Sequence, residues 1–117
     1  MKEETFRQGG ARVEVRLYHG DTVTLRATLQ DDNGDAIDLT TYTAYLHMKK
    51  DLMASTADFT ITGSTVGAAA NGIVDFAFTT TQTADVEDYT AEIELETATN
   101  VGETIAVFDI HVLRDVG

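Results

Sequence analysis

The sequence predicts an all-β protein, specifically a seven-stranded antiparallel immunoglobulin-like β-sandwich. Short runs of alternating apolar and polar residues indicate strands with one buried and one solvated face. Turn-forming residues separate these runs at intervals of roughly 10 to 15 residues, as in two-sheet sandwiches. Threonine is abundant and proline is absent, and β-branched side chains favour strands. A small barrel is the alternative architecture.

The clearest strand signal lies in residues 22–30, where every second residue is apolar. The sequence Asp-Asp-Asn-Gly-Asp follows, and its Asn33-Gly34 pair supplies the positive φ angles of a tight turn. In the last expected strand the alternation slips near Val107 and Phe108, which predicts a β-bulge. The remaining strands are expected at 11–18, 42–50, 59–62, 73–79, 89–96 and 104–114.

The inward phase of these strands also predicts the hydrophobic core, because side chains on one face of a strand share one environment. The expected core residues are Val15, Leu25, Leu29, Leu46, Phe76, Tyr89, Ile93 and Ile110.

Residues 1–10 are predicted to form a flexible N-terminal arm, and residues 11–117 a single domain. The arm is polar, lacks strand alternation and ends in Gly9-Gly10, which allow the chain to change direction. Phe6 is the apolar anchor of this segment, and Arg7 beside it could pair with an acidic neighbour. We therefore expect Phe6 and Arg7 to be assembly contacts, and deletion of residues 1–10 to leave stability unchanged. A frayed terminus without a role is the alternative.

The charge balance limits the partners. The chain has 8 basic and 20 acidic residues, a net charge of −12. Such a surface repels phosphate backbones and anionic membranes, so neither nucleic acid nor membrane is an expected partner. No apolar stretch approaches the ~20 residues of a membrane span. The first residues lack the apolar core of a signal peptide, which predicts synthesis in the cytoplasm.

Residues 31–35 are the strongest metal candidate. Asp31, Asn33 and Asp35 have the spacing of the first ligands in an EF-hand calcium loop. Ala36 and Tyr42 stand where that loop needs glycine and glutamate. A plain hairpin turn is therefore the favoured interpretation, with no metal site.

No pattern indicates catalysis. The absence of cysteine excludes disulfides, thiolate metal sites and cysteine nucleophiles. The three histidines, His19, His47 and His111, lack zinc-binding spacing. No serine lies in a nucleophile-elbow setting. We expect no catalytic residue and no cofactor.

Several short motifs together resemble a known family. His-Gly-Asp-Thr at 19–22 precedes an alternating strand, and Ala-Ile-Asp-Leu-Thr at 36–40 follows the turn. These motifs are similar to those of the N-terminal Ig-like domain of phage baseplate upper proteins and of related tail and neck domains. Segments 71–76, 89–92 and 105–112 fit the same pattern. Ala36 and Thr41 depart from it, because proline and glycine are common there.

The resemblance implies a non-catalytic structural component of a bacteriophage virion, in the tail, baseplate, neck or head surface. Such a component acts through protein–protein assembly with other virion proteins, as a homo-oligomer or in many copies. A free-standing carbohydrate- or protein-binding module is the alternative, and it would need an exposed aromatic platform.

Overall fold

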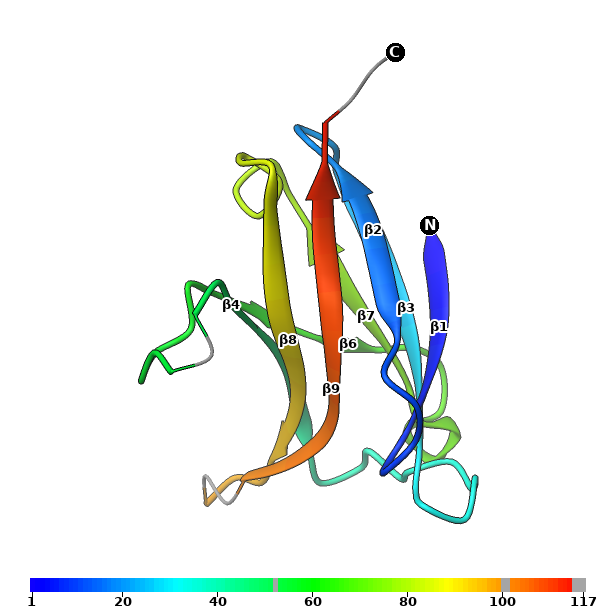
Figure 1. The fold of residues 1–117 in the computed structure, drawn as a ribbon. Coiled ribbons are helices and arrows are strands. Elements are labelled where there is room, and N and C mark those ends of the chain that lie inside the picture. Colours follow the sequence, from blue (N-terminus) through cyan, green and yellow to red (C-terminus); the bar gives the residue numbers. More distant parts are fainter. Residues whose placement is uncertain (52, 100–101, 115–117) are drawn as a thin grey trace.

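The computed structural model describes residues 1–51, 53–99 and 102–114 (Figure 1). Within them the chain forms nine strands and one 3-10 turn, η1. In chain order these are β1 (Lys2–Arg7), β2 (Glu14–Tyr18), β3 (Val23–Gln30), β4 (Thr43–Lys49), β5 (Phe59–Thr62), β6 (Ser64–Thr65), η1 (Ala69–Asn71), β7 (Ile73–Phe78), β8 (Glu87–Glu96) and β9 (Gly102–Leu113).

The strands form two mixed sheets, one with the order β1-β3-β7-β6 and one with the order β2-β9-β8-β4-β5. Figure 1 shows them as two layers, and buried residues of both belong to one hydrophobic core. The all-β prediction is therefore confirmed. The seven-stranded antiparallel form is corrected: β1 pairs with β3, and β2 with β9, in parallel. Both pairings join strands that no hairpin connects, so local sequence patterns do not reveal their direction.

The predicted core is confirmed. All eight residues expected inside have exposed fractions of 2% or less. Other large side chains complete the packing, among them Phe78, Phe108 and Leu17. The alternation of apolar and polar residues thus identified the buried side of these strands correctly. It could do so because the residues on the buried side of a strand must all be apolar, at every second position.

The predicted β-bulge is present in β9, slightly earlier than expected. Ile93 of β8 lies opposite Ala106, whereas Glu94 lies opposite Thr104, so Ile105 is the extra residue. The bulge lets Ile105 and Phe108 both face the core although they are three positions apart. Val107 consequently points outward and is 40% exposed.

The hairpin turn after β3 is also confirmed. Gly34 has a φ of 87°. The Asp31 carboxylate accepts hydrogen bonds from the backbone N–H groups of Asn33 and Asp35, at 2.9 and 3.0 Å. This short-range bonding of an aspartate to its own backbone stabilises the turn.

The predicted flexible arm is corrected. Residues 2–7 form β1 and pair with β3, from Lys2 opposite Leu25 to Arg7 opposite Gln30. The Phe6 side chain is only 2% exposed, and burial of this large ring holds an otherwise polar strand in place. The chain does turn at the two glycines, where Gly9 has a φ of 74° and Gly10 donates to the Arg7 carbonyl.

Candidate assembly surface

Phe6 is part of the core of its own domain. Its ring lies 4.6 Å from the ring of Phe108 in the facing sheet, measured between centroids. Because the side chain is buried in this way, it is not available to a neighbouring subunit. The prediction that Phe6 is an assembly contact is therefore corrected, and the residue stabilises the contact between β1 and β9.

Arg7 lies on the surface at the end of β1. Its guanidinium donates to the backbone carbonyl of Asp32 through Nη2 at 2.7 Å and Nε at 3.3 Å. Arg7 thus connects β1 to the turn at 31–35. An open cleft of about 280 Å³ lies beside it, lined by residues 6–11 and 104–107.

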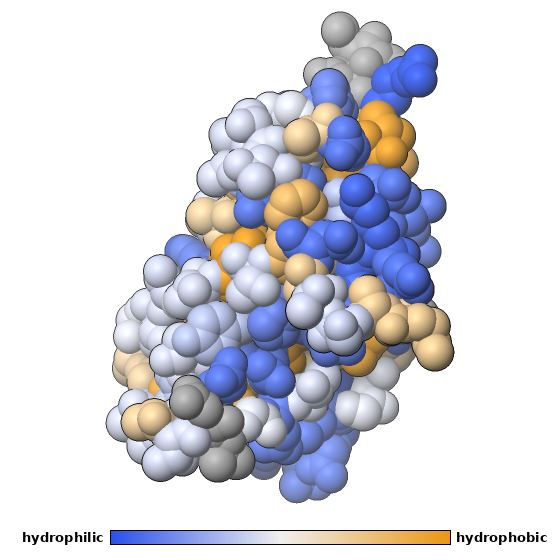
Figure 2. Space-filling view, turned by 90° about the vertical axis from the view of Figure 1, so that its left-hand side faces the viewer, coloured by the Kyte–Doolittle hydropathy of each residue, from blue (hydrophilic) through white to orange (hydrophobic). Residues whose placement is uncertain are grey.

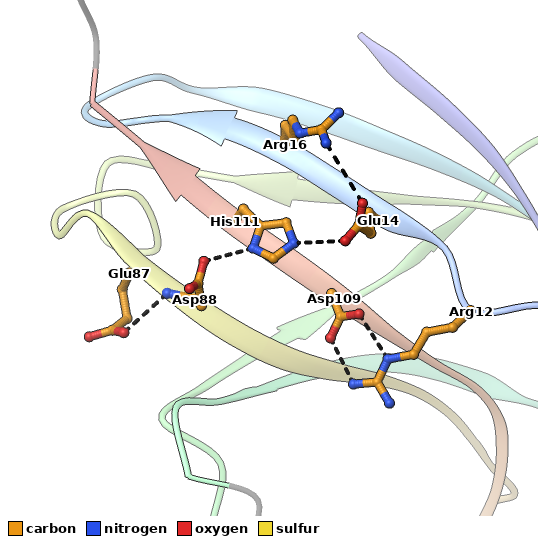
Figure 3. Close-up of polar contacts among 7 residues, drawn as sticks. All are labelled: Arg12, Glu14, Arg16, Glu87, Asp88, Asp109 and His111. Carbon is orange, nitrogen blue, oxygen red and sulfur yellow. Dashed lines mark hydrogen bonds and ion pairs between the residues drawn. The ribbon is translucent and has the colours of Figure 1, made fainter.

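A charged cluster occupies the outer face of β2, β9 and β8 (Figure 3). The His111 ring on β9 lies between two acids, with Nδ1 2.7 Å from Asp88 Oδ1 on β8 and Nε2 3.4 Å from Glu14 Oε1 on β2. Arg16 lies on the other side of Glu14, at 3.7 Å. The hydrogen bond to Asp88, with a smaller contribution from Glu14, raises the pKa of His111 above its ordinary value.

The neighbouring ion pair joins the β1–β2 connection to β9. Arg12 donates to both carboxylate oxygens of Asp109, at 2.9 and 2.7 Å. These charge-assisted hydrogen bonds lower the pKa of Asp109 and raise that of Arg12. The pair holds the connection in the position from which β2 begins.

Sequence reasoning missed this cluster. It assigned the histidines to polar positions, but the contact of His111 with Glu14 depends on the parallel pairing of β2 with β9, in which Arg16 lies opposite His111. The two acids lie 23 and 97 positions from the histidine. Only a correct pairing of distant strands would have brought them together.

The outer face of β8 is acidic along its length. Its even-numbered positions share this face, and four of them are acidic: Asp88, Glu92, Glu94 and Glu96. His47 of β4 contacts Glu94 at 3.4 Å and the Thr60 hydroxyl at 2.9 Å. Figure 2 shows the left-hand side of the molecule in Figure 1, where hydrophilic residues predominate and hydrophobic ones form small separate spots.

The described residues contain no group of three or more metal-ligating side chains in a suitable arrangement. At residues 31–35 the Asp31 carboxylate accepts hydrogen bonds from the backbone N–H groups of Asn33 and Asp35. In the same part of the chain no buried side-chain nitrogen or oxygen lacks a hydrogen-bond partner. None of the described helical segments has the length and apolar character needed to cross a membrane.

Comparison with protein families identifies the class. A model described as the BppU N-terminal domain matches residues 4–116, which span both sheets. The chain therefore belongs to this family, the N-terminal domain of phage baseplate upper proteins. The resemblance inferred from the sequence motifs is thus confirmed. None of the curated proteins matches the chain.

Solved structures show the same fold. The N-terminal domain of phage TP901-1 ORF48 is similar to this chain with a TM-score of 0.72 and 15% sequence identity. The similarity covers 97% of this chain and 99% of the other. At this identity the likeness concerns the fold alone.

Proposed function

We propose that this protein is a non-catalytic structural component of a bacteriophage baseplate, with an immunoglobulin-like sandwich that acts through protein–protein assembly. The observation that carries the proposal is the family match over residues 4–116. The proposed location is the virion, and the proposed partners are other virion proteins, with the chain present in several copies.

The surface chemistry supports assembly over catalysis. Ionisable side chains on this face pair with one another, as in Arg12–Asp109 and His111–Asp88. Asp88 and His111 lie opposite each other on β8 and β9, and cross-strand pairs of this kind stabilise strand register. With a net charge of −12, the surface favours partners that present basic patches. Arg7 remains an exposed candidate contact within this proposal, whereas Phe6 does not.

The alternative of a free-standing binding module lacks support. Carbohydrate platforms need exposed aromatic rings, which supply large rigid contact areas. Among the large hydrophobic side chains exposed in the described residues, Tyr18 is the one aromatic, at 45% exposure. A single exposed ring does not form a platform.

Labelling of intact particles tests the proposal. An epitope tag inserted beside Met53, which is 91% exposed, leaves the sheets intact. We expect gold-labelled antibody to mark the tail end of purified particles, and mass spectrometry to find the chain in them. A tagged non-virion protein of the same phage provides the control. Particles that lack the chain would contradict the proposal.

A further inference from the structure

The open edge of β2 is one of four sheet edges formed by the described strands, with those of β1, β5 and β6. β2 is the terminal strand of the five-stranded sheet, and it pairs on one side with β9. A terminal strand presents unpaired N–H and C=O groups to any strand that approaches it.

The direction of each backbone group in β2 follows from its parallel pairing. The Val13 carbonyl accepts from Asp109 N–H at 3.0 Å, and His19 N–H donates to the Leu113 carbonyl at 2.8 Å. In a parallel pair, alternate residues direct both backbone groups to the same neighbour. The backbone N–H and C=O groups of the odd-numbered residues of β2 therefore point toward β9. Those of Glu14 and Arg16 point the opposite way, to the open edge of the sheet.

These outward groups are unoccupied within the described chain. Outside the pairing with β9, β2 makes a backbone hydrogen bond at its end, where the Tyr18 carbonyl accepts from Asp21 N–H at 3.1 Å. Glu14 and Arg16 therefore offer two N–H and two C=O groups, two residues apart. That is the spacing of consecutive hydrogen-bonded pairs in an antiparallel ladder.

The side chains of the same two residues carry opposite charges on one face. Figure 3 shows Glu14 and Arg16 projecting from the same side of β2. If two β2 strands pair antiparallel about a two-fold axis at Val15, Glu14 lies directly opposite Arg16 of the partner subunit. The symmetry repeats this contact, so each hydrogen-bonded pair also contains an ion pair.

We propose that β2 is a self-association edge, which pairs antiparallel with β2 of a second copy and joins the two five-stranded sheets. Arg16 is well placed for this contact, because its side chain is 64% exposed and its intrachain partner Glu14 lies at 3.7 Å. A two-strand edge contact is small, so the dimer is weak, with a dissociation constant of about 10 µM or higher.

The other edge on this side of the molecule, β1, fits a second copy less well. It also carries opposite charges, Glu3 and Arg7, at positions that an antiparallel pair could align. The Arg7 guanidinium, however, is already bonded to the Asp32 carbonyl at 2.7 Å. Its release would cost a charge-assisted hydrogen bond.

Sedimentation equilibrium of the full chain tests the proposal. We expect a monomer–dimer equilibrium between about 10 µM and about 1 mM. Arg16→Glu places two negative charges opposite each other at both symmetry-related contacts between positions 14 and 16. It should therefore weaken dimerisation by at least about tenfold. The double variant Glu14→Arg with Arg16→Glu restores both pairs and should recover the affinity of the natural sequence.

Two further variants test whether backbone hydrogen bonds hold the dimer together and which of the two edges forms it. Arg16→Pro removes an outward N–H without touching the bonds to β9, and it should also abolish the dimer. Glu3→Arg, the matched change on β1, should leave the dimer intact. Circular dichroism and thermal melting confirm that each variant is folded.

A chain that remains monomeric at about 1 mM would overturn the proposal. So would a dimer that Glu3→Arg abolishes, or one that the charge exchange fails to restore. These results would leave the proposed virion role untouched, because particle labelling tests that role separately.

Discussion

Phe6 and Phe108 form the contact that joins the first strand of one sheet to the last strand of the other. Their ring centroids are 4.6 Å apart, and the ring planes meet at 47°. Both side chains are nearly inaccessible, with exposed fractions of 2% and 0%. Tilted aromatic pairs of this kind are stabilising beyond the area that they bury.

Replacement of Phe6 by alanine should lower the free energy of unfolding by about 3 kcal/mol, because it leaves a cavity beside Phe108. Urea denaturation measures the change. Thr5→Ala, at an exposed position of the same strand, is the control and should shift stability by less than about 0.5 kcal/mol.

Deletion of residues 1–10 should also destabilise the domain, contrary to the expectation from the sequence. The deletion removes β1, and with it the pairing to β3 and the buried Phe6 ring. A truncated chain that melts at the temperature of the full chain would show that β1 contributes nothing to the core.

The contact of His111 with Asp88 should make stability depend on pH. The hydrogen bond to Asp88 raises the pKa of His111 in the folded state above its ordinary value of about 6.5. The protonated ring therefore contributes stability that is fully present below about pH 6.5 and is lost as the pH rises through the folded-state pKa. Melting temperatures of the natural chain and of His111→Gln should differ more at about pH 5.5 than at about pH 9.

Two variants check the assignment of this pH effect. Asp88→Asn removes the principal partner of His111, so in its presence the effect of His111→Gln on the melting temperature should depend less on pH. His19→Gln, at an exposed turn residue, should leave the pH dependence of the melting temperature unchanged. A pH dependence that survives the loss of His111 would have to arise elsewhere.

Calcium should not stabilise the protein. The Asp31 carboxylate already accepts two backbone hydrogen bonds, from Asn33 and Asp35. A ligand that bound the folded state alone would raise the melting temperature by mass action. We expect equal melting temperatures in calcium and in chelator. A rise with calcium that Asp31→Ala abolishes would instead establish a metal site in this turn.

Alternation predicted the core because each strand has one buried face, and Leu25, Phe76 and Ile110 all lie where their phase placed them. It did not predict β1, because five of its six residues are polar and a single ring, Phe6, determines its position. Pairing of distant strands is likewise not visible locally. The parallel register of β2 with β9, and hence the contact of Glu14 with His111, follows only from the whole fold.

Thr83 is the one buried polar residue among those described. Its hydroxyl donates to the Asp21 carbonyl at 2.8 Å, and its own carbonyl accepts from Gly20 N–H at 2.9 Å. These bonds fasten the connection before β8 to the turn after β2. Nothing in the polar segment 80–88 distinguishes Thr83 from its neighbours, so its role is evident only in the structure.

Thr83→Val keeps the shape of the side chain but removes the hydroxyl that donates to the Asp21 carbonyl. It should lower the free energy of unfolding by about 0.5 to 1.5 kcal/mol. Thr83→Ser keeps the hydroxyl and removes one methyl group, for which we expect a loss of about 0.8 kcal/mol. Thr81→Val, at an exposed position two residues earlier, should change stability by less than about 0.5 kcal/mol. If Thr83→Val were as stable as the natural chain in urea denaturation, the hydroxyl would not hold the two turns together.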